Sequence, residues 1–176
     1  MQASASKPTR ILGIDPGSRV TGYGLIEIAA GRSRCLSQGV IKLSGEPLPP
    51  RLLQLFQQLR ELLSEHRPDE VAMEQVFVKR NVSSALVLGQ ARGAAICAVA
   101  EAGFELHEYA PASIKQAVAG NGRAEKPQIQ QMVKILLNLP ALPVADAADA
   151  LACALCHAHS RTLKLQTATI IKGMRR

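Results

Sequence analysis

Apolar residues recur in short runs separated by turn residues along much of the chain, and this spacing is typical of β-strands. The pattern predicts five strands, at residues 10–15, 20–29, 34–43, 70–76 and 105–109. Short turns at Pro16-Gly17-Ser18 and at Gly31 join the first three strands. An antiparallel meander is therefore expected at the start of the chain.

Apolar residues with helical spacing occupy most of the other segments. Helices are predicted at residues 51–65, 81–103, 111–118, from Pro127 to a point before Pro140, and at 145–159. Prolines at positions 47, 49 and 50 are expected to break the chain ahead of the first helix. Strands alternate with helices after the meander, which indicates an α/β fold. We expect a mixed five-stranded sheet, an antiparallel meander plus parallel strands, flanked by helices.

The length of 176 residues suits one domain that buries its own core. We expect this single domain to cover residues 1–160. The remaining residues, 161–176, form a basic C-terminal tail that we expect to be ordered only by DNA or a partner. Its basic residues are Arg161, Lys164, Lys172, Arg175 and Arg176.

The formal net charge of +7 and the pI near 9.6 favour a polyanionic partner such as nucleic acid. Residues 1–7 lack the apolar run of a signal peptide, so a cytoplasmic protein with reduced cysteines is expected. The most apolar stretch, residues 84–102, is interrupted by Gln90 and Arg92, and no membrane span is expected.

Four carboxylates stand out against this basic background. Asp15 and Glu74 each close a short apolar run that reads as a strand, and Asp146 and Asp149 lie three residues apart in a predicted helix. Two strand ends and one helix face can bring four acids into a single cleft. Such a cluster repels itself, and Mg²⁺ with its oxygen ligands suits it best.

A Mg²⁺ site on a basic protein indicates phosphodiester chemistry. Two divalent ions about 3.5–4 Å apart stabilise both the attacking and the leaving oxygen of a phosphodiester during hydrolysis. Asp15, at the end of a central strand, is the candidate that bridges the two ions. The sequence therefore predicts a Mg²⁺-dependent nuclease, with Mn²⁺ as a substitute cation.

The same residues carry a family resemblance. The stretches ILGIDPGSRVTGYGLIE, AMEQVF, SIKQAV and DAADALACALCHAH, in this order, resemble the RuvC Holliday junction resolvases over roughly residues 10–160. The resemblance implies a ribonuclease H-like fold, a homodimer, and cleavage of four-way DNA junctions in recombination and repair by symmetric cuts. It also implies that the four acids, Asp15, Glu74, Asp146 and Asp149, bind the metal.

The resemblance implies further residues and partners. Phe77 matches an aromatic that stacks on a base near the junction centre, and Lys115 and Lys126 match basic residues near the scissile phosphate. Arg80 lies on a segment expected at the DNA face or the dimer seam. RuvA and RuvB are the implied branch-migration partners, in a bacterial, nucleoid-associated location. The helix at 81–103, rich in Ala and Gly, is the candidate dimer seam.

Three other hypotheses compete with the nuclease. Ile14-Asp15-Pro16-Gly17 followed by Gly22 also resembles the first phosphate loop of actin-like ATPases and sugar kinases. A basic DNA-binding module without catalysis would leave the acids unexplained. Cys153-Ala154-Leu155-Cys156-His157 spells a haem-attachment motif, and with His159 it offers zinc ligands, but both fit poorly within one helix. Whether His157 and His159 lie near the metal remains open from sequence.

Overall fold

A mixed sheet forms the centre of the computed structural model, which describes residues 7–45, 47–75 and 82–174. Within these residues the sheet has five strands in the order β3-β2-β1-β4-β5. The strands β1, β2 and β3 pair antiparallel, and β4 and β5 add to β1 in parallel. The expected α/β architecture is confirmed. The bounds are β1 Thr9–Asp15, β2 Val20–Ala29, β3 Arg32–Lys42, β4 Glu70–Glu74 and β5 Leu106–Tyr109.

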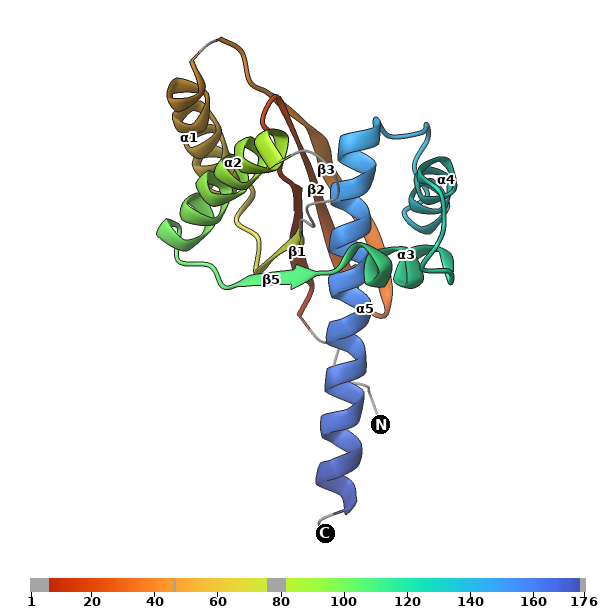
Figure 1. Ribbon diagram of the computed structural model, residues 1–176. Helices are drawn as coiled ribbons and strands as arrows, with labels where there is room; N and C mark the ends of the chain where they lie inside the picture. The colour runs from red at the N-terminus through yellow and green to blue at the C-terminus, as the bar shows by residue number, and fades with distance from the viewer. Residues whose placement is uncertain (1–6, 46, 76–81, 175–176) are drawn as a thin grey trace.

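Helices cover both faces of the sheet (Figure 1). One face carries α1 and α2, and the other carries α5 with α3 and α4 beside it. The long α5 runs across β1 and β2 and extends well beyond the sheet (Figure 1). The bounds are α1 Leu48–His66, α2 Val82–Glu101, α3 Pro111–Ala119, α4 Lys126–Leu136 and α5 Ala145–Met174.

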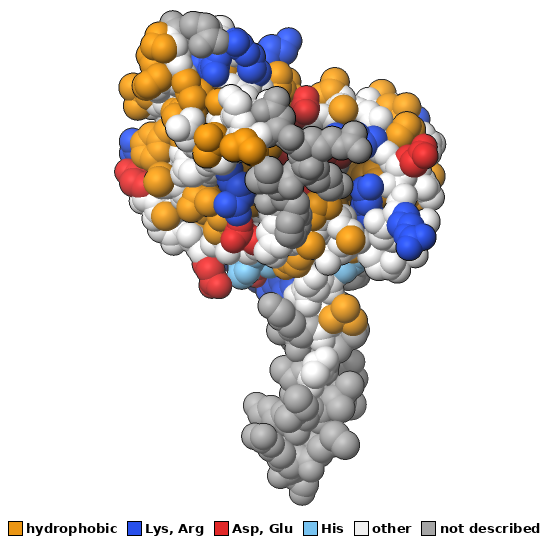
Figure 2. Space-filling view, viewed as in Figure 1, with side chains coloured by type: hydrophobic (Ala, Val, Ile, Leu, Met, Phe, Trp, Pro, Cys, Tyr) orange, Lys and Arg blue, Asp and Glu red, His pale blue; other side chains and the backbone are white. Residues whose placement is uncertain are grey.

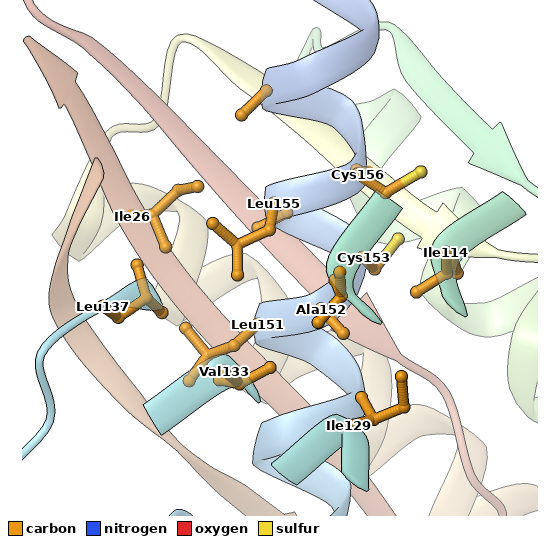
Figure 3. Packing of buried hydrophobic residues seen from close by; sticks show 14 of the residues in the cluster. Ile26, Ile114, Ile129, Val133, Leu137, Leu151, Ala152, Cys153, Leu155 and Cys156 are labelled. Atoms are coloured by element: carbon orange, nitrogen blue, oxygen red, sulfur yellow. The ribbon is translucent and has the colours of Figure 1, made fainter. Parts of the chain in front are cut away.

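The period-two alternation of the strands creates a separate core on each face. On β1, Leu12 and Ile14 pack toward α1 and α2, whereas Ile11 packs toward α5. The α5 core also receives Ile26 from β2 and side chains from α3 and α4, which point at the helix (Figure 3). The same alternation places Glu70 and Glu74, the two ends of β4, on the α5 side, because Val71 and Met73 face the other core.

Two helix boundaries differ from the prediction. The first helix begins at Leu48 rather than 51, with proline in its opening turn, where a missing N–H costs no hydrogen bond. The last helix continues to Met174 instead of ending near His159, so the expected break before the basic tail is absent. Thr162 and Thr167 bond back to carbonyls four residues earlier, and no Gly or Pro interrupts residues 158–172.

Length and composition alone would let α2 cross a membrane. In the fold, however, Ala91, Ala95, Ala98 and Val99 are buried in the core that α1 and the sheet share. Arg92 also forms an ion pair with Glu108, a residue of β5. One face of α2 is therefore part of the core of this domain.

A polar network joins the start of β4 and the end of β5 to α5. The His157 ring is buried and lies 2.6 Å from Glu70 Oε2 through Nε2 and 2.6 Å from the Tyr109 hydroxyl through Nδ1. Arg161 donates to Glu70 Oε1 at 2.8 Å. Burial alone would raise the pKa of Glu70, but the hydrogen bonds from Arg161 and His157 outweigh it and lower the pKa. This network ties β4 and β5 to the helix.

We predict that Glu70→Ala lowers the free energy of unfolding by about 1–3 kcal/mol at pH 7, because it leaves polar groups of His157 and Arg161 without their partner. The lowered pKa means that the Glu70 charge stabilises the fold above the ordinary value of 4.5. That contribution disappears as the pH falls through the folded-state pKa. Urea unfolding at several pH values measures both effects.

The matched control is Glu101→Ala, which removes a surface ion pair with Arg60 at 2.7 Å. Surface pairs contribute about 1 kcal/mol or less, so this variant should change stability little. Equal losses in the two variants would show that the network holds α5 no more firmly than a surface contact.

Candidate active site

Asp15 and Glu74 lie side by side at one edge of the sheet. Each is the last residue of its strand, and β1 and β4 are adjacent and parallel with Ile14 paired to Met73. The two carboxyl ends therefore meet at the same edge, and both side chains take the α5 side. The sequence prediction that strand ends place these two acids together is confirmed by this register.

The other two acids come from the first two turns of α5. Asp146 is the second residue of the helix, and Asp149 follows one turn later. The backbone carbonyl of Asp146 lies directly over Gly22, which pairs with Asp15 across β1 and β2. The N-terminus of α5 is thus at the sheet edge where Asp15 and Glu74 end, and the positive end of the helix dipole favours acids there.

The crowding of these carboxylates has an electrostatic signature. Burial and the charges of Asp149, Glu74 and Asp146, in that order, raise the pKa of Asp15 from 3.8 to about 7. Burial and the charge of Asp149 also raise the pKa of Glu74. Asp15 thus responds to all three other acids and lies at the centre of the group.

Two lysines border the acids in a cavity of about 710 Å³. Lys126, at the start of α4, donates to Asp149 Oδ2 at 2.8 Å, and this hydrogen bond raises the pKa of the lysine. Lys115, on α3, lines the cavity and lowers the pKa of Glu74 by its charge. Asp15, Glu74 and Asp149 line the same cavity, and Asp146 is not among its lining residues.

The donor set fits a hard divalent cation. It consists of carboxylates, and a cation would offset both the burial and the neighbouring charges that raise the pKa of Asp15. Among the residues that the structure describes, no three His, Cys, Asp or Glu side chains already converge on one point. Asp149 is engaged by Lys126, so a cation that binds Asp149 competes with this ammonium group.

Two predicted DNA-binding residues, Phe77 and Arg80, lie outside the described residues. Sequence reasoning assigned no role to Leu88 of α2 or Ile129 of α4, which contribute to the cavity wall. Both lie in segments predicted to be helical, and only the tertiary arrangement brings them to the acids. The polar network of Glu70, Tyr109 and His157 was also missed, because its members are far apart in the sequence.

The structure argues against the cysteine and histidine sites. Cys153 and Cys156 are buried free thiols, and burial raises the pKa of Cys153 far above its usual value and that of Cys156 to about 11. His157 bonds Glu70 at the start of β4, whereas the acids lie at its end. His159 is exposed. The histidines are therefore not at the acidic end of α5.

The phosphate-loop hypothesis also loses support. In the turn after β1, the N–H of Gly17 donates to Thr21 Oγ1 at 3.1 Å, and the Thr21 hydroxyl donates to the Gly17 carbonyl at 3.1 Å. A phosphate loop needs such backbone N–H groups directed at the ligand. Here this N–H closes the β1–β2 turn instead.

Comparison with known proteins agrees with this geometry. The model of the family described as crossover junction endodeoxyribonuclease RuvC matches residues 11–157. The chain belongs to the RuvC family. Its relative from Halorhodospira halophila, named crossover junction endodeoxyribonuclease RuvC, is 57% identical over 163 residues, covering 92% of this chain and 96% of the relative.

Solved structures support the same assignment. Thermus thermophilus RuvC in complex with a Holliday junction substrate aligns with a TM-score of 0.81 and 37% identity, covering 88% of this chain and 96% of that one. The yeast mitochondrial Holliday junction resolvase Ydc2 shares the fold at a TM-score of 0.59 and 18% identity, over 84% of this chain and 78% of its own. The expected ribonuclease H-like fold is confirmed for this RuvC-family chain.

We predict that Asp15→Asn stabilises the metal-free protein above pH 7. Between pH 3.8 and about pH 7, the Asp15 carboxyl group keeps its proton in the folded protein but loses it in the unfolded chain, because folding raises its pKa from 3.8 to about 7. Wild-type stability therefore falls as the pH rises through this window. The variant carries no ionisable group at this position and does not lose this stability. Its free energy of unfolding should exceed that of the wild type by at most about 4 kcal/mol at pH 8 and by almost nothing near pH 4. Urea unfolding in EDTA measures the difference.

Glu61→Gln, which removes one negative charge from an exposed position on α1, is the control for net charge. It should show no gain that depends on pH. If the difference in free energy of unfolding between Asp15→Asn and the wild type stays constant from pH 4 to pH 8, the pKa of Asp15 is not raised by burial and the neighbouring acids.

Proposed function

We propose that this protein is a structure-selective endodeoxyribonuclease that resolves four-way (Holliday) DNA junctions during homologous recombination and DNA repair. The observation that carries the proposal is the gathering of four acids at one end of the sheet in a RuvC-family chain of net charge +7. The relative from Thermus thermophilus, solved with a Holliday junction substrate, supports this choice of DNA.

The catalytic and metal-binding residues in this proposal are Asp15, Glu74, Asp146 and Asp149. Two Mg²⁺ ions per site, or Mn²⁺ in their place, would activate water and stabilise the charge on the attacking and leaving oxygens. Asp15 is central among the acids and is the natural carboxylate to be shared. Cations held by these acids would also help to orient the reacting phosphate, and Asp15 itself is largely shielded from bulk water.

Lys115 and Lys126 are the proposed contacts to the scissile phosphate. Both border the cavity of the acids, and 74% of the Lys126 side chain is exposed to solvent. An incoming phosphate would draw Lys126 away from Asp149 and leave that carboxylate to a cation. Phe77 and Arg80 complete the proposed DNA contacts on the strength of the family resemblance, with Phe77 stacking on a base.

A homodimer with α2 at its seam would cut two strands symmetrically, because a two-fold enzyme offers one site to each strand of a two-fold junction. Val82 and Leu86 are 70% and 64% exposed on α2. Gly89, Gly93 and Cys97 continue this stripe at helical spacing, and open space surrounds both glycines. Figure 2 shows hydrophobic side chains gathered over α1 and α2. Such an exposed apolar stripe fits a protein interface.

The remaining features of the proposal come from the family. Residues 1–160 form the nuclease domain, the protein acts at the bacterial nucleoid in the cytoplasm, and RuvA and RuvB are its branch-migration partners. The segment 161–176 is basic in sequence and is the proposed C-terminal tail.

We predict that Asp15→Asn, Glu74→Gln, Asp146→Asn and Asp149→Asn each lower the rate of junction cleavage by about 100-fold or more, because each removes a charged metal ligand. Junction affinity in EDTA should change little, since phosphate contacts remain. A synthetic four-way junction and a linear duplex of matching sequence, each with Mg²⁺ or EDTA, provide the assay.

The wild type should make paired nicks in the junction, only with Mg²⁺, and leave the duplex intact. Glu61→Gln is again the matched control and should cut normally. Equal cleavage of duplex and junction would refute structure selectivity, and an acid variant that cuts at the wild-type rate would remove that residue from the site.

For the dimer, we predict that Leu86→Glu weakens self-association by about 100-fold, since burying an unpaired carboxylate costs on the order of 3 kcal/mol. Size-exclusion chromatography with light scattering measures the mass. Ile135→Glu, at a 59% exposed position on α4, should leave the dimer intact. A Leu86→Glu protein that stays dimeric at low concentration would exclude α2 as the seam.

A further inference from the structure

Three glycines on β1 and β2 face α5 and leave a slot in the sheet under the helix. Gly13 and Gly24 are paired with each other across the two strands, and Gly22 is paired with Asp15. Their neighbours Leu12, Ile14 and Leu25 fill the opposite core, which confirms that the glycines take the α5 side.

The backbone of α5 fills this slot. A methyl carbon on Gly22 would lie 2.0 Å from the carbonyl oxygen of Asp146, and one on Gly13 would lie 2.0 Å from that of Ala150. Non-bonded carbon atoms pack at about 3.5–4.0 Å, so a side chain at either place would push the helix outward by roughly 1 Å or more. Helix and strands therefore touch backbone to backbone.

The obstacle at Gly24 is of another kind. A methyl carbon there would first meet the Leu151 side chain, at 2.5 Å from Cγ and 2.6 Å from Cδ2, and then the Leu151 backbone nitrogen at 3.0 Å. The two closest atoms thus belong to a side chain, whereas the carbonyl of Asp146 can move only with the helix itself. All three glycines lie close to the α5 backbone, and the clash is with a backbone carbonyl oxygen at 2.0 Å only at Gly13 and Gly22.

The contact at Gly22 joins the two halves of the acidic site. Gly22 is held opposite Asp15 by the β1–β2 pairing, and the helix residue that rests on it is Asp146. Asp149 is one turn further along the same helix. The distance between strand and helix at this one point therefore sets how far Asp146 and Asp149 stand from Asp15 and Glu74.

We propose that Gly22 is a positioning residue of the nuclease. Its lack of a side chain lets the first turn of α5 rest on β2 and holds the helix-borne acids against the strand-borne acids. The proposal rests on the proposed function only in that the four acids act together on one metal-dependent reaction. Gly13 supports the same approach one turn further along the helix.

The main variant is Gly22→Ala, measured in the full-length protein. We expect it to fold and to bind the junction in EDTA within about 2-fold of the wild type, because no phosphate contact is lost. A displacement of about 1 Å can lower a rate by about 100-fold, and we expect that loss in junction cleavage at saturating DNA. Mn²⁺ binding to the DNA-free protein, measured by calorimetry, should weaken by about 10-fold.

Two controls separate position from stability. Gly24→Ala adds the same methyl group on the same strand and face, but its closest contacts are with the Leu151 side chain and it approaches the helix backbone less closely, at 3.0 Å, so the losses of cleavage and Mn²⁺ affinity should be clearly smaller than for Gly22→Ala. Leu59→Ala removes a buried side chain from the opposite core and lowers the melting temperature without touching α5. It should cut normally at temperatures where it is folded.

The positioning role is overturned if Gly22→Ala keeps the wild-type rate and Mn²⁺ affinity, or if cooling restores its activity as it does for Leu59→Ala. Should Gly22→Ala not fold, Gly13→Ala provides the same test through Ala150. If neither folds, the glycines serve folding itself and the proposal fails. If the wild type does not cut junctions, the proposed function fails, while the Mn²⁺ comparison still tests the geometry.

Discussion

The close packing of α5 against β1 and β2 is the contact on which the rest of the structure depends. Along one helix, Asp146 lies in the first turn and Asp149 one turn later, a run of Ala, Leu and Cys is buried against the sheet, and His157 bonds Glu70 and Tyr109. The acids and the polar network are thus held at opposite ends of β4, with the apolar contact between them. A rigid helix transmits its placement at the sheet to both ends.

The site built on this contact opposes folding. Burial and three neighbouring charges make the Asp15 carboxylate unfavourable, and the positive end of the α5 dipole and Lys126 offset only part of that repulsion. The apolar cores on both faces of the sheet supply the stability that lets such a cluster persist. In the proposed metal-dependent function, a divalent cation bound here would relieve the repulsion that the fold maintains.

The sequence predicted the features that depend on residues close together in the chain and missed those that depend on residues far apart. Strand alternation and apolar helical spacing are local, so the five strands and the sheet type were predictable, as was the meeting of Asp15 and Glu74 at strand ends. The predicted α5 was too short, because the basic composition of the tail suggested disorder. No Gly or Pro lies between Ala145 and Gly173, so nothing in the sequence stops the helix there. The contact between His157 and Glu70 joins residues 87 positions apart, and no local sequence pattern predicts it. Gly22 was interpreted as part of a possible phosphate loop, whereas its close contact with α5 appears only in the folded structure.

The architecture also links the proposed dimer to the site. Leu88 of α2 lines the cavity of the acids, and Leu86, on a different side of the same helix turn, lies in the exposed apolar stripe. A second copy packed on that stripe would sit within one helical turn of the cavity wall. Each copy would then have its acids at a distance from the two-fold axis that α2 and the sheet fix together. Because α2 is itself anchored to α1 and the sheet, little freedom would remain between the two sites. Symmetric cutting of a two-fold DNA substrate requires such a fixed separation, and here one core helix would provide both the wall of the site and the seam.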